Sequence, residues 1–221
     1  MINAIVLAAG ESKRMGMPKP LLRFPRSSCV PARHTEASGD ARPTKSDDTT
    51  FLEQIISVLQ RSEVDRITVV LGSQAPMVRA STDLSGADII INEDYRQGQL
   101  SSLIAGLKSV PPETEAILLC LVDNPFITVG SVDGIIGAFR LTGRPIVIPV
   151  LQGQRGHPTL FARPMFDELR VAPAGKGARH VVHSNQDKVF EAQVPDRGIL
   201  TRIDTPEDYL SCFGAAPRII E

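Results

Sequence analysis

In Ile2-Asn3-Ala4-Ile5-Val6-Leu7-Ala8, which leads into Ala9-Gly10, the sequence carries a nearly continuous apolar run that ends at a glycine. The run is short and rich in β-branched residues, which is typical of a strand buried on both faces of a parallel sheet. Similar runs recur at 67–71, 89–91, 116–122 and 146–150. The first run therefore predicts a buried parallel strand with a glycine turn directly after it.

Between these runs, apolar residues recur at helical spacing. One such face collects Phe51, Leu52, Ile55, Ile56 and Leu59, and a second collects Leu100, Leu103, Ile104 and Leu107. This spacing indicates amphipathic helices. Buried strands that alternate with such helices predict an α/β fold with a doubly wound, mostly parallel sheet of the Rossmann-like kind. Ligands bind such sheets at the carboxyl ends of the strands, so the residues after each strand are the candidates for function.

The composition limits the classes of protein to which this chain can belong. The chain has 221 residues, 42% hydrophobic and 22% charged, which fits a globular protein and excludes a disordered, collagenous or fibrous one. With no linker or repeat, the length predicts a single domain over 1–221. Lys and Arg number 24 against 25 Asp and Glu, so the charge balance argues against a nucleic-acid partner. No apolar run has the length of a membrane helix, so no membrane partner is expected.

The expected compartment is the cytoplasm. Residues 1–7 lack the positive region of a signal peptide. The cysteines, Cys29, Cys120 and Cys212, are odd in number and widely spaced, which fits neither a disulfide framework nor a metal pattern. We expect two buried thiols and one loop thiol, as in a reducing compartment.

Two regions interrupt the alternation of strands and helices. Residues 23–50 contain Pro25, Pro31 and Pro43 and almost no large apolar side chain. This composition predicts a long surface loop or insertion that contributes little to the core. The second region, 151–158, predicts a loop between the strand at 146–150 and a short strand near 159–161.

The strongest functional signal is the stretch after the first strand. Gly10 and Gly16 let the backbone bend closely around a ligand, and N–H groups in such a loop form a nest for an anion. Arg14 and Lys19 add positive charges suited to phosphate. The spacing matches neither a Walker A loop nor a dinucleotide-binding fingerprint. On the residues alone, an ordinary strand-to-helix turn with solvated charges is the alternative.

This stretch, Leu7-Ala8-Ala9-Gly10-Glu11-Ser12-Lys13-Arg14-Met15-Gly16-Met17-Pro18-Lys19-Pro20-Leu21-Leu22, resembles the signature of MobA-like nucleotidyltransferases, L-A-A-G-x-S-x-R-M-G-x-P-K-x-L-L. The resemblance implies that the loop holds an NTP triphosphate, with Arg14 and Lys19 on phosphate oxygens. Ala9 is similar to the cytidylyltransferase branch that acts on molybdopterin, because the guanylyltransferase branch usually carries glycine there. The implied substrate-binding residues of the loop are Leu7, Ala8, Ala9, Gly10, Ser12 and Gly16.

Two further blocks extend the resemblance. Residues 92–107 are similar to a second sequence block of the same family. This similarity implies that Ser101 and Ser102 lie beside the nucleotide base; the alternative is that they only cap the N-terminus of a helix. Arg155-Gly156-His157-Pro158 matches an R-G-H-P loop, which implies that Gly156 and His157 lie near the acceptor substrate together with Arg179. A structural role is the alternative for the histidine. His180 and His183 lie on the same predicted helix, and we expect both on its solvent-exposed face.

Two acids are candidate metal ligands. Asp123 directly follows the strand at 116–122, where a carboxylate can hold Mg²⁺, and Asp204 precedes Thr205-Pro206. Capping of the following helix is the alternative for each. The chain departs from the family pattern at two positions, since Gly175 and Arg202 stand where acids are common.

The resemblance implies a Mg²⁺-dependent transfer of CMP from CTP to the phosphate of molybdopterin, with release of pyrophosphate. Arg14, Lys19 and Asp123 are the implied catalytic residues, and a molybdoenzyme is a possible recipient of the product. Such a transfer needs positioning and charge neutralisation rather than a protein nucleophile. Two alternatives stay open: another phosphorylated acceptor, such as a sugar or alcohol phosphate, and a non-catalytic chaperone that binds a cofactor or nucleotide.

Overall fold

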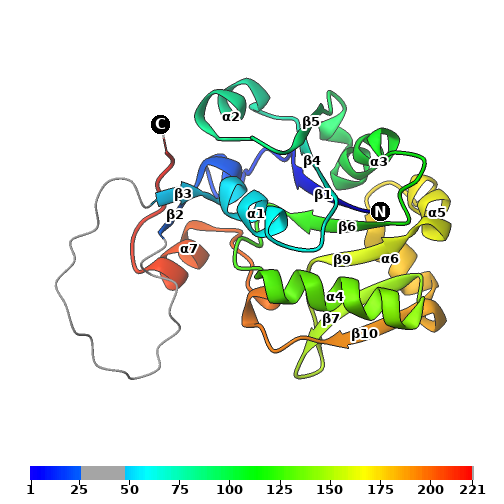
Figure 1. Ribbon diagram of the computed structural model, residues 1–221. Coiled ribbons are helices and arrows are strands. Elements are labelled where there is room, and N and C mark those ends of the chain that lie inside the picture. Colours follow the sequence, from blue (N-terminus) through cyan, green and yellow to red (C-terminus); the bar gives the residue numbers. More distant parts are fainter. Residues whose placement is uncertain (26–47, 221) are drawn as a thin grey trace, which may run out of the picture.

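The protein is described by a computed structural model over residues 1–25 and 48–220. In that part, one eight-stranded sheet carries helices on both faces (Figure 1). The strands are β1 (Ile2–Ala8), β4 (Arg66–Leu71), β5 (Asp88–Ile91), β6 (Ala116–Leu121), β7 (Ile146–Leu151), β8 (Gln154–Arg155), β9 (Thr159–Ala162) and β10 (Val189–Gln193). Every apolar run therefore forms the strand that the sequence predicts, with ends shifted by one residue at most.

The strands follow the order β10-β7-β9-β6-β1-β4-β5, and β8 pairs with the end of β7. Pairing is parallel except at β9, which runs antiparallel to both β6 and β7, and at β8. The sheet is thus mostly parallel, which confirms the predicted fold class.

Helices connect the strands and cover the sheet. The α-helices are α1 (Phe51–Gln60), α2 (Ala75–Ser81), α3 (Gln99–Ser109), α4 (Val129–Thr142), α5 (Phe166–Arg170), α6 (Gly177–Ser184) and α7 (Pro206–Phe213). Single 3₁₀ turns are η1 (Lys19–Leu21), η3 (Tyr95–Gln97), η4 (Arg163–Met165), η5 (Gln186–Lys188) and η6 (Arg197–Leu200). No helix of the described chain is long and apolar enough to cross a membrane.

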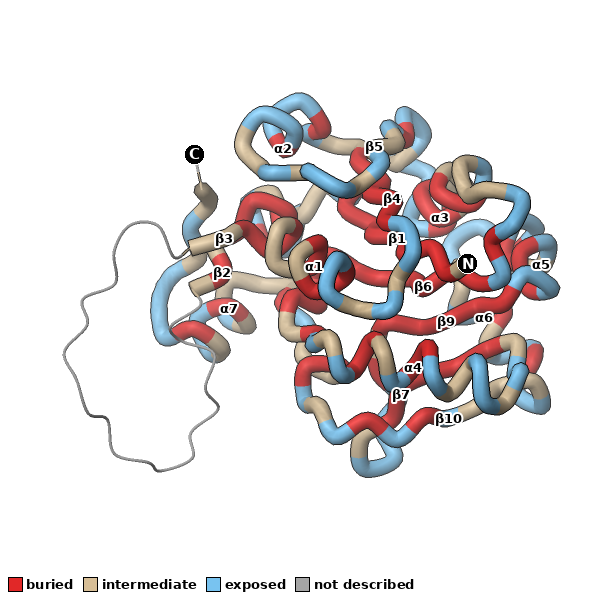
Figure 2. The backbone as a smooth tube through the Cα atoms, in the orientation of Figure 1, coloured by how far each residue is buried: buried red, intermediate tan, exposed pale blue. Residues whose placement is uncertain are grey.

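Two hydrophobic cores lie on opposite faces of the sheet, and β1 divides them. Ala4 and Val6 belong to the core packed under α1 and α4, whereas Ile5 and Leu7 belong to the core packed under α3, α5 and α6. All seven residues of β1 are buried, as Figure 2 shows for the centre of the sheet. Burial on both faces explains why the strand reads as a continuous apolar run rather than an alternating one.

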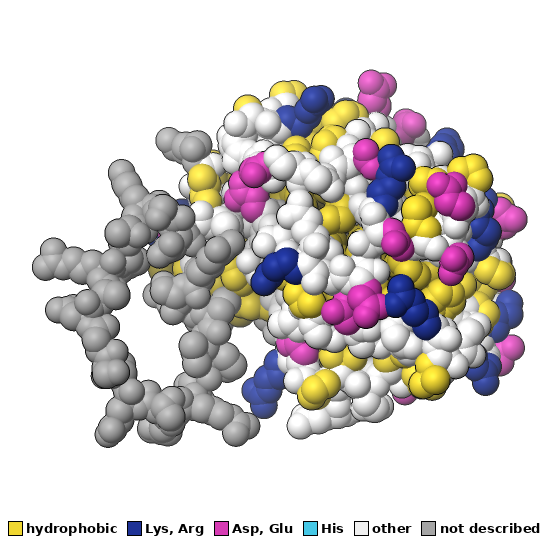
Figure 3. All heavy atoms as spheres, viewed as in Figure 1, with side chains coloured by type: hydrophobic (Ala, Val, Ile, Leu, Met, Phe, Trp, Pro, Cys, Tyr) yellow, Lys and Arg dark blue, Asp and Glu magenta, His cyan; other side chains and the backbone are white. Residues whose placement is uncertain are grey.

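The surface over α1 and α4 carries mixed charge. Figure 3 shows basic and acidic side chains interspersed on this face, which agrees with the nearly balanced charge of the sequence. Of the cysteines, Cys120 is buried as predicted, Cys212 is only half-buried on α7, and Cys29 lies outside the described residues.

The prediction for residues 23–50 is wrong at both ends of the segment. A two-stranded antiparallel sheet forms there from β2 (Arg23–Pro25) and β3 (Asp48–Thr50). Phe24 is buried against Phe51, Phe126 and Phe213, with ring centroids 5.3–6.1 Å apart. The aromatic partners come from distant parts of the chain, so the local composition did not reveal this packing. Residues 26–47 lie outside the described residues.

The close contact between α3 and the sheet generates a stability prediction. A Cβ added at Gly106 would lie 2.7 Å from Ile5 Cγ2 and 3.2 Å from Val70 Cγ2. We expect Gly106→Ala to lower the free energy of unfolding by about 1–3 kcal/mol, because the added methyl overpacks the core. The matched control is Gly137→Ala in α4, where an added Cβ meets nothing within 4 Å.

Alanine favours a helix more than glycine does. The control variant Gly137→Ala should therefore raise the free energy of unfolding by up to about 1 kcal/mol. Urea unfolding of both variants measures the difference. A Gly106→Ala protein as stable as Gly137→Ala would contradict the close approach of helix and sheet.

Candidate active site

A cleft of about 370 Å³ opens over the carboxyl ends of the central strands. Leu7 in β1 pairs with Leu121 in β6, so the segments that leave these two strands begin side by side. The cleft is lined by Leu7, Ala8, Ala9, Gly10, Ser12, Lys13, Arg14, Lys19, Pro20, Tyr95, Gly98, Gln99, Ser102, Leu121, Val122, Asp123, Arg202 and Asp204. It occupies the position at which a doubly wound sheet binds its ligand.

The loop after β1 is organised around Ser12. Its backbone is left-handed, with φ of 53°, and its carbonyl accepts hydrogen bonds from the backbone N–H groups of Met15 and Gly16, both at 3.0 Å. Its side-chain oxygen accepts a hydrogen bond from the backbone N–H of Lys19 at 3.1 Å. The loop therefore turns back on itself and delivers Lys19 to the start of η1.

The two loop glycines differ in their relation to the cleft. Gly10 lines the cleft, and a Cβ placed on it would meet no atom within 4 Å. Gly16 has φ of +72°, a conformation that favours glycine, but it does not line the cleft as formed by residues 1–25 and 48–220. Gly16 therefore permits the tight turn of the loop after β1 rather than contact with a ligand.

Lys19 lies at the floor of the cleft and is 8% exposed. Its Nζ lies 2.5 Å from Asp204 Oδ1 and 3.3 Å from Asp123 Oδ2. A buried ammonium is stable there because two carboxylates compensate its charge. The two predicted acids are therefore brought together by one of the predicted cations.

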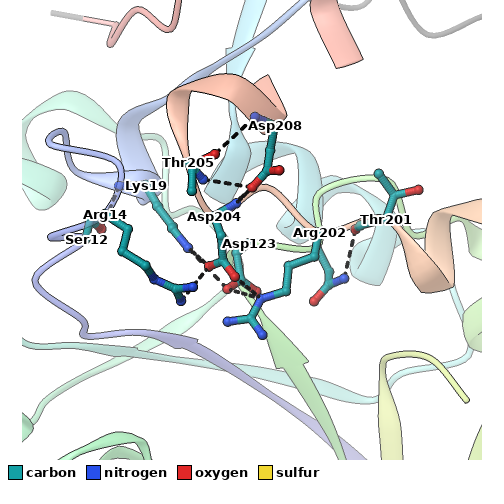
Figure 4. Close-up of polar contacts among 10 residues, drawn as sticks. Ser12, Arg14, Lys19, Asp123, Thr201, Arg202, Asp204, Thr205 and Asp208 are labelled. Carbon is teal, nitrogen blue, oxygen red and sulfur yellow. Dashed lines mark hydrogen bonds and ion pairs between the residues drawn. The ribbon is translucent and has the colours of Figure 1, made fainter. Parts of the chain in front are cut away.

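Two arginines complete the charged cluster (Figure 4). The Nε atom of Arg202 lies 2.9 Å from Oδ2 of Asp123 and 2.9 Å from Oδ2 of Asp204. Arg14 reaches Asp204 Oδ1 at 3.1 Å. The sequence singled out Arg202 only as a departure from the family pattern, and that departure was the available signal for its place in the site.

Neither acid caps a helix, so the capping alternative is wrong for both. Thr205 caps α7 by accepting a hydrogen bond from the Asp208 N–H, while Asp208 accepts the N–H groups of Asp204 and Thr205. Thr128 caps α4. The side chains of Asp123 and Asp204 are consequently directed to the cleft.

The charges of the cluster act on Asp204. Burial is the largest effect on this carboxyl and by itself raises its pKa. Hydrogen bonding and charge from Lys19, with the charges of Arg202 and Arg14, outweigh burial and hold the pKa below its usual value. Asp123 Oδ1 is buried and has no hydrogen-bond partner among the described residues. The carboxylate pair thus keeps one oxygen without a partner.

The serines of the second block do not cap α3, because its N-cap residue is Gly98. The Nδ2 of Asn92 donates to Ser101 Oγ at 2.9 Å and to Ser102 Oγ at 3.0 Å. Ser102 lines the cleft, whereas Ser101 donates to backbone carbonyls of the turn before α3. The asparagine is buried and was missed by the sequence analysis.

The predicted acceptor residues lie outside the cleft formed by the described chain. Gly156 packs against the backbone of Ile199, where its lack of a Cβ permits the contact. Burial, as the main cause, lowers the pKa of His157, and its Nδ1 has no partner within the described residues. Arg179 is exposed on α6, the helix that also carries His180 and His183. These three acceptor assignments stay predictions.

The structure brings most of the predicted residues to the cleft. Those that line it are Leu7, Ala8, Ala9, Gly10, Ser12, Arg14, Lys19, Ser102, Asp123 and Asp204. Lining residues that the sequence analysis did not propose are Lys13, Pro20, Tyr95, Gly98, Gln99, Leu121, Val122 and Arg202. Tyr95, Gly98 and Gln99 fall in the second block, so this block indicated more of the cleft than Ser102 alone.

Known proteins resemble this chain over nearly its whole length. Molybdenum cofactor cytidylyltransferase of Escherichia coli (strain K12) is 26% identical over 211 residues, which cover 95% of this chain and 94% of that protein. A probable molybdenum cofactor guanylyltransferase of Mycobacterium avium (strain 104) is 28% identical over 210 residues, covering 94% and 92%.

Among solved structures, Rv0371c from Mycobacterium tuberculosis H37Rv superimposes with a TM-score of 0.75 at 29% identity, covering 97% of both chains. The complex of that protein with manganese gives a TM-score of 0.72, covering 97% of this chain and 98% of the other. Residues 4–189, which include the loop after β1 and Asp123, match a family of defined activity. By this match, the chain belongs to the family of MobA-like NTP transferase domains.

Proposed function

We propose that this nucleotidyltransferase moves CMP from CTP to the phosphate of molybdopterin and releases pyrophosphate. The observation that carries the proposal is the buried Lys19, which joins Asp123 and Asp204 beneath the loop that follows β1. A cation and two acids at a strand end suit a triphosphate and its metal ion. The cytidylyltransferase relative and Ala9 favour CTP. Free Cys120 and Cys212 suit a cytoplasmic enzyme.

Asp123 and Asp204 are the residues that would hold a divalent cation, and we propose Mg²⁺. The unpartnered, buried Oδ1 of Asp123 fits such a ligand, because a carboxylate oxygen without a donor is costly to bury. The manganese complex of a structural relative supports a divalent ion. Mg²⁺ bound there neutralises charge on phosphate oxygens.

The chain itself positions the reactants. Lys19 and Arg14, with N–H groups of the loop after β1, would hold the β- and γ-phosphates. An oxygen of the acceptor phosphate forms a bond to the α-phosphorus, and the bond from that phosphorus to the bridging oxygen breaks as pyrophosphate leaves. The acceptor oxygen is already anionic, so the transfer needs no strong base from the protein. Stabilising charge on the departing pyrophosphate is the main contribution of the two cations.

Another phosphorylated acceptor is the second candidate, and a specific observation favours it. Gly175 and Arg202, which stand where family members commonly have acids, both lie in the half of the chain expected to meet the acceptor. A changed acceptor site would leave the loop after β1 as it is. A chaperone that only binds cofactor or nucleotide is an outcome of the experiment that follows.

The deciding experiment measures pyrophosphate release with Mg²⁺, each of the four NTPs, and molybdopterin or a phosphorylated metabolite as acceptor. Release that requires both CTP and molybdopterin supports the proposal. Release with a phosphorylated sugar or alcohol and none with molybdopterin moves the activity to the second candidate. No pyrophosphate release with any pair of substrates, together with measurable binding of nucleotide or pterin, identifies a chaperone.

Lys19→Ala tests the central cation. We expect pyrophosphate release to fall by about 10²–10³-fold, because a preorganised charge that stabilises the leaving group is lost. Lys108→Ala on α3 is the matched control, because this lysine is exposed and does not line the cleft of the described chain. The control should retain most of the activity, and circular dichroism checks that both variants fold. Equal losses in the two variants would contradict the assignment of Lys19.

Ala9→Gly tests the preference for the base. The methyl group of Ala9 packs beside Gly72 and Tyr95 at the edge of the cleft. Its removal makes room for a larger base, so we expect the ratio of kcat/KM values for GTP and CTP to rise. Ala8→Gly is the control, because the methyl of Ala8 belongs to the core on the opposite face of the sheet. An unchanged ratio in Ala9→Gly would rule out this residue as the determinant.

A further inference from the structure

The two carboxylates of the cleft offer four oxygens, and side-chain cations already contact three of them. Oδ1 of Asp204 contacts Lys19 and Arg14, and its Oδ2 contacts Arg202. Oδ2 of Asp123 contacts Lys19 and Arg202. The fourth oxygen, Oδ1 of Asp123, is buried and unpartnered within the described chain. A metal ion that binds both acids must therefore displace or share a contact that a cationic side chain now makes.

The three cations differ in their freedom to move. The side chain of Lys19 is 10% exposed and is enclosed by its partners, whereas those of Arg202 and Arg14 are 50% and 66% exposed. Of the two arginines, only Arg202 contacts both carboxylates, and it does so through Nε (Figure 4). Its two terminal nitrogens make no hydrogen bond with the described residues. Arg202 therefore lines the cleft with a guanidinium edge that is open to a phosphate group.

We propose that Arg202 makes the divalent-cation site conditional on nucleotide, an inference that rests on the proposed function. In the nucleotide-free protein, its guanidinium occupies the space between Asp123 and Asp204 that the metal ion requires. The triphosphate draws the guanidinium onto phosphate oxygens, which frees Oδ2 of Asp204 and leaves Oδ2 of Asp123 in contact with Lys19 alone. Arg202 is thus both a competitor of the metal ion and a binding residue for the nucleotide.

The charges of the cleft favour this exchange. Lys19, Arg14 and Arg202 face two carboxylates, so the cluster has one positive charge in excess. A divalent cation that enters alone is repelled at short range by this excess positive charge. A triphosphate reverses the sign of the charge in the cleft. Its oxygens also offer the arginine a forked contact at least as strong as the carboxylates do.

The exchange depends on an arginine at position 202. An acid at this position would add a ligand to the metal site. The arginine supplies a competitor in its place, held at 2.9 Å from each carboxylate. A ligand shifts an equilibrium only by its different affinity for two states, and the triphosphate supplies that difference here.

The test measures binding of Mn²⁺ alone by the electron paramagnetic resonance signal of the free ion. We compare the unaltered protein with Arg202→Gln, and with Arg14→Gln as the matched loss of charge at Asp204. Without nucleotide, Arg202→Gln should bind Mn²⁺ about tenfold or more tightly, because it removes a cation that contacts both acids. Arg14→Gln should tighten binding far less.

A second measurement uses α,β-methylene-CTP, which cannot release pyrophosphate, as the nucleotide probe. In the presence of Mn²⁺, Arg202→Gln should bind this analogue more weakly than the unaltered protein, because a phosphate contact is lost. Tighter metal binding combined with weaker nucleotide binding is not the effect of a merely disturbed structure. Equal Mn²⁺ affinities for the unaltered protein and Arg202→Gln would overturn the inference. So would equal tightening in Arg14→Gln, or no Mn²⁺ binding by any variant.

Neither measurement requires an acceptor or turnover. If transfer fails with every substrate pair while Arg202→Gln still tightens Mn²⁺ binding, the proposed reaction fails and the role of Arg202 remains. If transfer succeeds while the Mn²⁺ affinities are equal, the reaction remains and the inference fails.

Discussion

The ammonium group of Lys19 joins three stretches of chain that are far apart in the sequence. It extends from η1, just after the loop that follows β1, to Asp123 after β6 and to Asp204 before α7. A carboxylate removed from water is costly by several kcal/mol unless a cation compensates it, and the same holds for the ammonium. Each of the three groups is therefore stabilised by the others, and together they form the floor of the cleft.

Backbone pairing makes this contact possible. Because β1 and β6 are parallel neighbours, the segments that leave their carboxyl ends emerge on the same edge of the sheet. The N–H of Ile203 donates to the carbonyl of Asp123 at 2.8 Å, which fixes the approach to α7 beside that edge. The capping box of Thr205 and Asp208 satisfies the start of α7 without Asp204. Function at this edge is thus a consequence of how the sheet and one helix end satisfy their own hydrogen bonds.

The sequence predicts those parts of the molecule that local patterns determine. Strands buried on both faces, such as β1 and β6, leave continuous apolar runs, and the position of Asp123 after such a run predicted its place at the cleft. The strand β10 was not predicted, because it lies at the edge of the sheet, only one of its five residues is buried, and it has no such run. Arg202 could be recognised as unusual, but its place in the site could not be predicted, because its hydrogen bond to Asp123 joins residues 79 positions apart. The motif around His157 likewise did not reveal that this residue is absent from the lining of the cleft formed by the described chain.

The small sheet of β2 and β3 has a consequence for how the start of α1 is held. Pro25 pairs with Asp48, so the chain leaves and rejoins the described structure at one paired position. Phe24 and Phe51 secure this position within the aromatic core. The packing that fixes this position is apolar, so it depends less on salt than the ion pairs of the cleft do.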